Sequence, residues 1–117
     1  MVRRDNGEKT PVALGELETK AAELLQAVHD GLFEKARVNL EEHIFSAQTL
    51  EEAKQLQAEH GGFIKTMWCG DLQCELDMKE KAGMSSRCIP FRQEKLSEVC
   101  ACCGKPAKHM VVWGVAY

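Results

Sequence analysis

Four of the six cysteines in this 117-residue chain form two pairs at a spacing suited to metal chemistry. Four residues separate Cys69 from Cys74, two separate Cys100 from Cys103, and 25 lie between the pairs. Two such pairs are typical of a structural tetrahedral zinc site, in which four thiolates bind at about 2.3 Å. Because four protein ligands leave no open position for a substrate, we expect a zinc ion held here to be structural.

The residues beside each pair suit this role. Gly104 directly follows Cys103 and permits the tight turn of a zinc knuckle. Cys74 falls in the first turn of a helix that Asp71 is expected to begin, where the partial positive charge of the helix favours a thiolate. We therefore predict that Cys69, Cys74, Cys100 and Cys103 form the metal site.

The remaining candidate ligands fit structural roles better. Cys102 stands between two predicted ligands, so its side chain is expected to point away from their metal. Cys88 is interpreted as a small buried apolar residue. His60 and His109 are interpreted as surface or structurally satisfied histidines rather than substitute ligands.

A redox function is the competing interpretation of Cys100 and Cys103, because a CxxC pair also occurs in thioredoxin-like proteins. That motif normally opens a helix after a strand, whereas CACCGKP is typical of a loop. The chain contains no glycine-rich phosphate loop and no Gly-x-Ser-x-Gly motif. The residues therefore favour a zinc-stabilised module without an active site of its own.

The elements that must position these cysteines begin after an extended lead-in, residues 1–15. From Glu16 onward, apolar residues recur at steps of three and four, which predicts a long amphipathic helix with a core-forming stripe. The stripe comprises Leu17, Ala21, Leu24, Leu25, Val28, Leu32 and Ala36. Gly31 interrupts this pattern, which leaves a bend or break there open.

A second helix is predicted from a capping box formed by Thr49 and Glu52. It should end near His60, where two glycines follow. Asp71 is expected to cap a third helix over residues 72–81, which Gly83 ends.

Strands are predicted over residues 63–68, 86–91 and 109–117. Pro90 places the second of these at an edge or a strand end, and the third should be buried on at least one face. The resulting order, roughly β-α-α-β-α-β-(zinc knuckle)-β, predicts an α+β fold with two layers, in which helices pack on a small mixed sheet.

Composition argues against two classes of partner. The net charge is −3, with 18 acidic and 15 basic residues, so the basic face of a nucleic-acid-binding domain is not expected. No stretch approaches the about 20 apolar residues that a membrane span needs. The charged N-terminus is unlike a signal peptide, so we expect reduced cysteines and a cytoplasmic location.

Several segments together resemble a known family. WCGDLQCELDMKEKAG, SRCIPF, CGKPAK and the final WGVAY are similar to the C-terminal domain of prolyl-tRNA synthetases, class II enzymes of the archaeal and eukaryotic type. VRRDNGEKTPV resembles the last strand of that enzyme's anticodon-binding domain and the join after it. The resemblance therefore assigns residues 1–15 to the end of that domain and a linker, and residues 16–117 to the C-terminal zinc-binding domain.

The resemblance also implies a function. The parent enzyme uses ATP to join proline to tRNA(Pro) through a prolyl-adenylate, and this fragment would lack its catalytic domain. The fragment would hold one structural zinc ion, bind no ATP itself, and brace the catalytic and anticodon-binding domains of a homodimeric parent. Contact with tRNA would be made through the parent. In the family, the carboxylate of a terminal tyrosine, here Tyr117, can approach the active site, although Val115 replaces a residue that is often basic.

Two alternatives remain open at this point. In the first alternative, the chain is a free-standing zinc-binding module that binds a protein partner. In the second, it is a CxxC redox protein.

Overall fold

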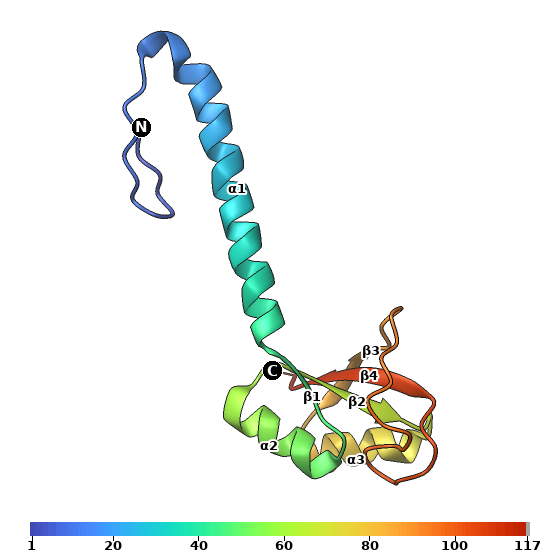
Figure 1. Ribbon diagram of the computed structural model, residues 1–117. Coiled ribbons are helices and arrows are strands. Elements are labelled where there is room, and N and C mark those ends of the chain that lie inside the picture. Colours follow the sequence, from blue (N-terminus) through green and yellow to red (C-terminus); the bar gives the residue numbers. More distant parts are fainter. Residues whose placement is uncertain (117) are drawn as a thin grey trace. The chain divides into compact units, whose positions relative to one another are not determined.

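The computed structural model describes residues 1–116, so the expectation for Tyr117 lies outside the described residues. The chain forms two compact units, one of residues 1–41 and one that begins at residue 42. The elements in chain order are the short 3-10 helix η1 (Leu14–Glu16), α1 (Leu17–Glu42), β1 (Ile44–Ser46), α2 (Leu50–His60), β2 (Phe63–Trp68), α3 (Leu72–Ala82), β3 (Ser85–Cys88) and β4 (His109–Gly114) (Figure 1). None of the helices in the described part is long and apolar enough to cross a membrane.

The first unit begins with a small hairpin in place of the expected strand. The backbone N–H of Thr10 donates to the carbonyl of Met1 at 2.9 Å, and a single antiparallel bridge joins Val2 to Lys9. The Arg3 guanidinium donates to Asp5 and to the carbonyl of Ala27 in α1. These bonds attach the hairpin to the helix within this unit.

Helix α1 runs without interruption through Gly31, so the helix neither breaks nor ends there. Its apolar stripe is not core-forming as expected, because no residue of α1 is buried. Leu25, Leu32 and Phe33 are more than half exposed. The apolar periodicity therefore predicted the helix correctly. It does not indicate whether another part of the same chain covers the apolar stripe.

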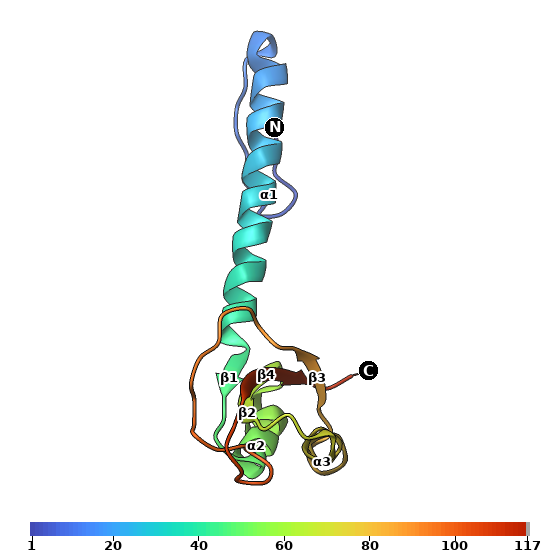
Figure 2. The same ribbon diagram turned by 90° about the vertical axis from the view of Figure 1, so that its right-hand side faces the viewer.

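The second unit contains the four-stranded mixed sheet, in the order β1-β2-β4-β3. Strands β1 and β2 are parallel, while β4 lies antiparallel to both β2 and β3. Both α2 and α3 lie on one face of this sheet (Figure 2). The predicted α+β class, with helices on a small mixed sheet, is confirmed.

The two helices of this unit begin as the sequence predicts. The Thr49 hydroxyl accepts a hydrogen bond from the backbone N–H of Glu52 at 3.2 Å, and the Asp71 carboxylate accepts one from Gln73 at 3.0 Å. The Glu52 carboxylate accepts a hydrogen bond from the backbone N–H of Gln48 at 2.7 Å. A capping box would have placed this carboxylate on the N–H of Thr49, the next residue. Each cap satisfies an amide that has no partner inside its helix.

The core lies between the sheet and these helices. Ile64 and Trp113 are cross-strand partners within it, and Met78 of α3 packs against the same cluster. Trp113 donates its Nε1–H to the Thr66 hydroxyl at 2.9 Å, and both side chains are about 1% exposed. This bond satisfies the polar atom that a buried indole brings into an apolar core.

Three details of the sheet differ from expectation. Strand β4 ends at Gly114, so residues 115 and 116 lie outside the strand that was predicted to include them. Strand β1 was not predicted, because three residues carry too little periodicity to identify a strand. Strand β3 ends at Cys88, before Pro90, and does not extend to residue 91. Beyond it, the side-chain amide of Gln93 takes the place of a strand, because it bonds both the N–H and the carbonyl of Met110.

Candidate metal centre

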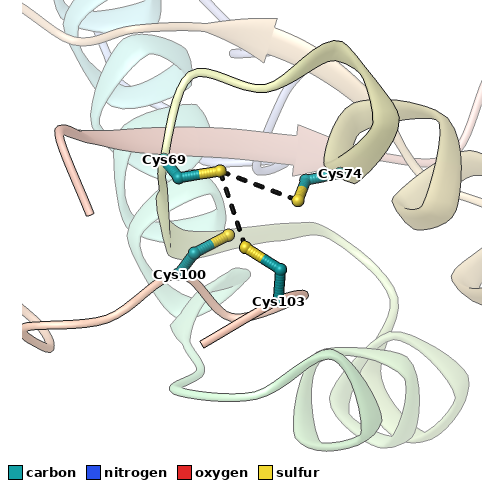
Figure 3. Close-up of side chains that lie close together, drawn as sticks. All are labelled: Cys69, Cys74, Cys100 and Cys103. Atoms are coloured by element: carbon teal, nitrogen blue, oxygen red, sulfur yellow. Dashed lines mark hydrogen bonds between the residues drawn. The ribbon is translucent and has the colours of Figure 1, made fainter. Parts of the chain in front are cut away.

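The structure brings the four predicted cysteines together. The Sγ atoms of Cys69, Cys74, Cys100 and Cys103 all lie within 4.8 Å of one another. Figure 3 shows the four side chains pointing toward a common centre. Cys69 follows the last residue of β2, Cys74 lies in the first turn of α3, and the other two lie in the turn before β4.

The separations between sulfurs suit a tetrahedral metal ion. The Sγ atom of Cys69 lies 3.6 Å from that of Cys74 and 3.7 Å from that of Cys103. Zinc–sulfur bonds of about 2.3 Å in a regular tetrahedron place neighbouring sulfurs about 3.8 Å apart. A disulfide would need about 2.05 Å. The donor set and its spacing therefore fit a thiophilic divalent metal such as zinc.

The turn that carries Cys100 and Cys103 is closed by backbone hydrogen bonds. The N–H of Gly104 donates to the carbonyl of Cys100 at 3.0 Å, and the N–H of Cys100 donates to the carbonyl of Lys105 at 2.8 Å. Gly104 has a φ of 70°, a conformation that residues with a Cβ rarely adopt. The loop consequently folds back and presents both thiols to the same side.

Ala101 attaches this turn to the rest of the unit. Its N–H donates to the carbonyl of Met67 in β2, and its carbonyl accepts from the N–H of Leu50 in α2, both at 3.0 Å. At the end of the turn nearer β4, the backbone N–H of Lys108 donates to the carbonyl of Trp68 at 2.8 Å. Ala101 could not be singled out from the sequence, because a backbone contact of a small residue leaves no signal there.

Burial and hydrogen bonding act differently on the four thiols. Burial raises the pKa of Cys69, and burial together with the neighbouring Cys103 and Cys69 thiols raises the pKa of Cys74. Burial would also raise the pKa of Cys100, but backbone N–H groups, chiefly those of Cys103 and Cys102, lower it to about 7. Amides directed at a sulfur stabilise its thiolate, as expected for a metal-binding knuckle.

Two lysines add positive charge near this cluster. Lys105 and Lys108 line a surface hollow together with Cys69, Gly70 and Asp71. A tetrathiolate zinc centre carries a net charge of about −2. The Lys105 ammonium lies 3.9 Å from the Asp71 carboxylate in this hollow, so Lys108 is the group that would offset part of the charge of such a centre.

Cys102 and Cys88 lie outside the cluster of four. Cys102 is half-buried, and its Sγ donates to the carbonyl of Cys74 at 3.4 Å. Burial raises the pKa of Cys102 to about 12. Cys88 is exposed, so the expectation that it is buried was wrong. Its strand, β3, lies at the edge of the sheet and is mostly exposed.

The two histidines considered as substitute ligands also lie elsewhere. His60 stacks on Phe45, with 5.0 Å between ring centroids, and His109 is the exposed first residue of β4. Among the described residues, neither histidine belongs to the cluster of possible metal ligands that the four cysteines form.

A comparison with protein families decides the relationship of the chain. The family described as "Prolyl-tRNA synthetase, C-terminal" matches residues 50–117, which hold all four clustered cysteines. The chain belongs to this family. The resemblance stated from the sequence is therefore confirmed.

Individual relatives of the chain, named as proline–tRNA ligases, match it over its whole length. "Proline--tRNA ligase" of Clostridium novyi (strain NT) is 54% identical over all 117 residues, and "Proline--tRNA ligase 2" of Bacillus thuringiensis (strain Al Hakam) is 50% identical. "Proline--tRNA ligase" of Lachnoclostridium phytofermentans is 47% identical. The chain spans only 24–25% of the length of these relatives.

Proposed function

We propose that this chain is a structural zinc-binding domain that supports the attachment of proline to tRNA(Pro) by a prolyl-tRNA synthetase. The observation that carries the proposal is the convergence of four thiols, from two segments with 25 residues between them, at the spacing of a tetrahedral metal site. Membership of the synthetase family supplies the reaction that the domain would serve. The fragment itself would catalyse no step.

The metal would be held by Cys69, Cys74, Cys100 and Cys103. When bound, zinc supplies a cross-link between segments and no catalytic chemistry, because four thiolates fill its tetrahedral shell. Cys69 directly follows β2, Cys74 lies in the first turn of α3, and Cys100 and Cys103 lie in the turn before β4. The site would therefore fasten the ends of two strands and one helix to each other.

This cross-link would stabilise a small core. Trp68 and Cys102 pack against both the cysteine cluster and the main core cluster. Residues 100–108 of this turn include no large apolar side chain, so metal ligation would supply the stability that burial does not. In small zinc modules, metal binding contributes much of the folding free energy, with apparent values of about 10–16 kcal/mol.

Within a synthetase, the domain would brace the catalytic and anticodon-binding domains and help to place the active site. The division proposed from the sequence, with residues 1–15 in the anticodon-binding domain and a linker, belongs to this hypothesis. So do a cytoplasmic location, a homodimeric parent, ATP use by that parent alone, and an approach of Tyr117 to the active site. The net charge of −3 supports contact with tRNA through the parent rather than through this domain.

A rescue experiment tests the proposal. The Clostridium novyi ligase, shortened by the segment that this chain matches, is assayed for tRNA charging with and without the zinc-loaded chain. We expect the chain to restore part of the lost charging and its Cys100→Ala variant to restore none. The Cys88→Ala variant, which lacks an exposed thiol outside the cluster, should rescue like the unmodified chain. Failure of the zinc-loaded chain to rescue under any condition would contradict the bracing role.

The two alternatives have less support. A free-standing interaction module and a CxxC redox protein each account for some of the cysteines, but neither accounts for the family match over residues 50–117. The turn at Cys100 also does not open a helix, as a thioredoxin-like pair would.

A further inference from the structure

The four thiols of the metal centre differ in their access to solvent. Cys69, Cys74 and Cys100 are only 7%, 3% and 3% exposed, whereas Cys103 is exposed. Cys103 lies at the outer end of the turn, and the exposed residues Gly104 and Lys105 follow it. A thiol-reactive molecule in solution therefore reaches the sulfur of Cys103 before it reaches the other three.

The surroundings of Cys103 favour a second reaction after the first. Its Sγ lies 3.7 Å from that of Cys69, and all three other sulfurs are within 4.8 Å. The adjacent Cys102 is not the obvious partner, because its thiol is half-buried and donates to the carbonyl of Cys74. A modified Cys103 therefore meets a buried ligand thiol before it meets its sequence neighbour.

We propose that Cys103 is a site of oxidation by hydroperoxides, through which the metal centre opens. The inference rests on the proposed zinc function. It assigns to Cys103 a role as the reactive ligand, while Cys69, Cys74 and Cys100 are protected by burial. Lys105 and Lys108 line a surface hollow with Cys69, so positive charge also lies near the thiol that would react second.

The chemistry proceeds in two balanced steps. The Cys103 sulfur attacks one oxygen of hydrogen peroxide, the O–O bond breaks, an S–O bond forms, and the released hydroxide takes up a proton as water. The Cys69 sulfur then attacks the sulfenic sulfur of Cys103, an S–S bond forms, and the S–O bond breaks to release a second water. Two thiols lose two electrons and one peroxide gains them. A zinc ion bound by the four thiolates would lose two of its ligands in this way and would be released.

The chain contains a matched control thiol. Cys88 is also exposed but lies on the edge strand β3, outside the cluster of four. Modification of Cys88 should therefore leave the metal in place. A Cys88→Ser background removes this competing thiol from measurements at Cys103.

The test uses the zinc-loaded chain in the Cys88→Ser background. It is treated with less than one equivalent of hydrogen peroxide in the presence of dimedone, which traps sulfenic acids, and the modified residue is located by mass spectrometry. A chromogenic chelator records zinc release in a parallel sample without dimedone. We expect Cys103 to be modified at least about tenfold faster than each buried ligand, and zinc release to follow at the same rate. A disulfide from Cys103 to a buried ligand should accumulate without the trap.

Two further variants keep the proposal testable. Cys103→His retains a zinc ligand but removes the oxidisable thiol, and it should slow peroxide-driven zinc release at least about tenfold. Cys102→Ser should leave the release rate unchanged. First modification at Cys69, Cys74 or Cys100, or release that is lost in Cys102→Ser, would overturn the proposal.

The zinc content measured before oxidation separates this inference from the proposed function. A chain that binds no zinc overturns both the structural-zinc function and the release step. A chain that binds zinc but is modified first at a buried ligand retains its function and overturns only the role of Cys103.

Discussion

The sulfur atoms of Cys69 and Cys103 lie 3.7 Å apart, although the two residues are 34 positions apart in the chain. One follows β2 and the other lies in the turn before β4, and the pairing of these two antiparallel strands places them together. The last pair of that register is Trp68 with His109, which come directly before Cys69 and six positions after Cys103. The approach of these two thiols is therefore a consequence of the strand register.

Removal of the metal should loosen the turn more than the sheet. We expect a chelator to lower the melting temperature and to speed hydrogen exchange first at the amides of Cys100, Ala101 and Gly104. Their hydrogen bonds lie within or beside the turn that the ligands anchor. Exchange at Ile64 and Val111 in the core should change least. Exchange measured by mass spectrometry, with equal acceleration in both regions as the contrary result, checks this prediction.

The hydrogen bond between Thr66 and Trp113 offers a test of the core. Thr66→Val keeps the shape of the side chain but leaves the buried indole N–H without a partner. We expect it to lower the free energy of unfolding by about 1–3 kcal/mol. Thr66→Ser keeps the hydroxyl and should cost about 1 kcal/mol, the contribution of one methyl group. Urea unfolding of the three proteins measures both values, and equal stability of Thr66→Val and the unmodified chain would contradict the prediction.

Two adjacent glycines after α2 should respond differently to alanine. A Cβ at Gly62 would overlap the carbonyl oxygen of His43, which accepts the N–H of Phe63 at 2.8 Å. Gly61 has a similar φ of 67° but open space around it. We expect Gly61→Ala to cost about 1–3 kcal/mol from backbone strain alone. Gly62→Ala should cost more than about 4 kcal/mol, because the backbone of His43, directly before β1, must also move.

Thermal unfolding of the two glycine variants distinguishes these costs. Equal melting temperatures would show that the close approach of Gly62 to the backbone of His43 does not affect stability. If Gly62→Ala fails to fold while Gly61→Ala folds, the prediction holds.

The pKa of Asp77 predicts a small dependence of stability on pH. Lys81 and Gln73 both bond the carboxylate of Asp77 on α3 and lower its pKa. The lowered pKa means that the bonds stabilise the folded state above the unfolded-state pKa of about 3.9, and that this stability is lost as the pH falls through the folded-state value. We expect Asp77→Asn to melt slightly below the unmodified chain at pH 7.

The difference between these two proteins should shrink when the pH is lowered below about 4. Glu80→Gln on the same helix removes one negative charge without these bonds and serves as the control. A difference that stays constant from neutral to acidic pH would contradict the assignment.

Local signals explain why much of this fold was predictable. Thr49 and Asp71 cap their helices through bonds that reach only two or three residues, so adjacent sequence contains all the necessary information. The α+β class followed from the order of these elements. The gathering of the four cysteines could be expected because their spacing reflects how thiolates surround one metal ion.

Features that depend on distant partners were not predictable. Strand β1 has three residues and exists because Ile44 to Ser46 pair with β2. The exposed stripe on α1 and the exposed Cys88 were both expected to be buried, because an apolar pattern identifies a face but not what covers it. Likewise, the backbone bonds of Ala101 and the side-chain bonds of Gln93 depend on backbone groups of distant residues, which local sequence does not report.

The most direct test of the central claim is the zinc content of the chain purified without added metal, measured by mass spectrometry alongside Cys69→Ala and Cys88→Ala. We predict about one zinc ion per chain in the unmodified protein and in Cys88→Ala, and almost none in Cys69→Ala, which retains three thiols. Absence of metal from the unmodified chain, with thiol counts that reveal disulfides, would contradict the structural-zinc account and favour the redox alternative.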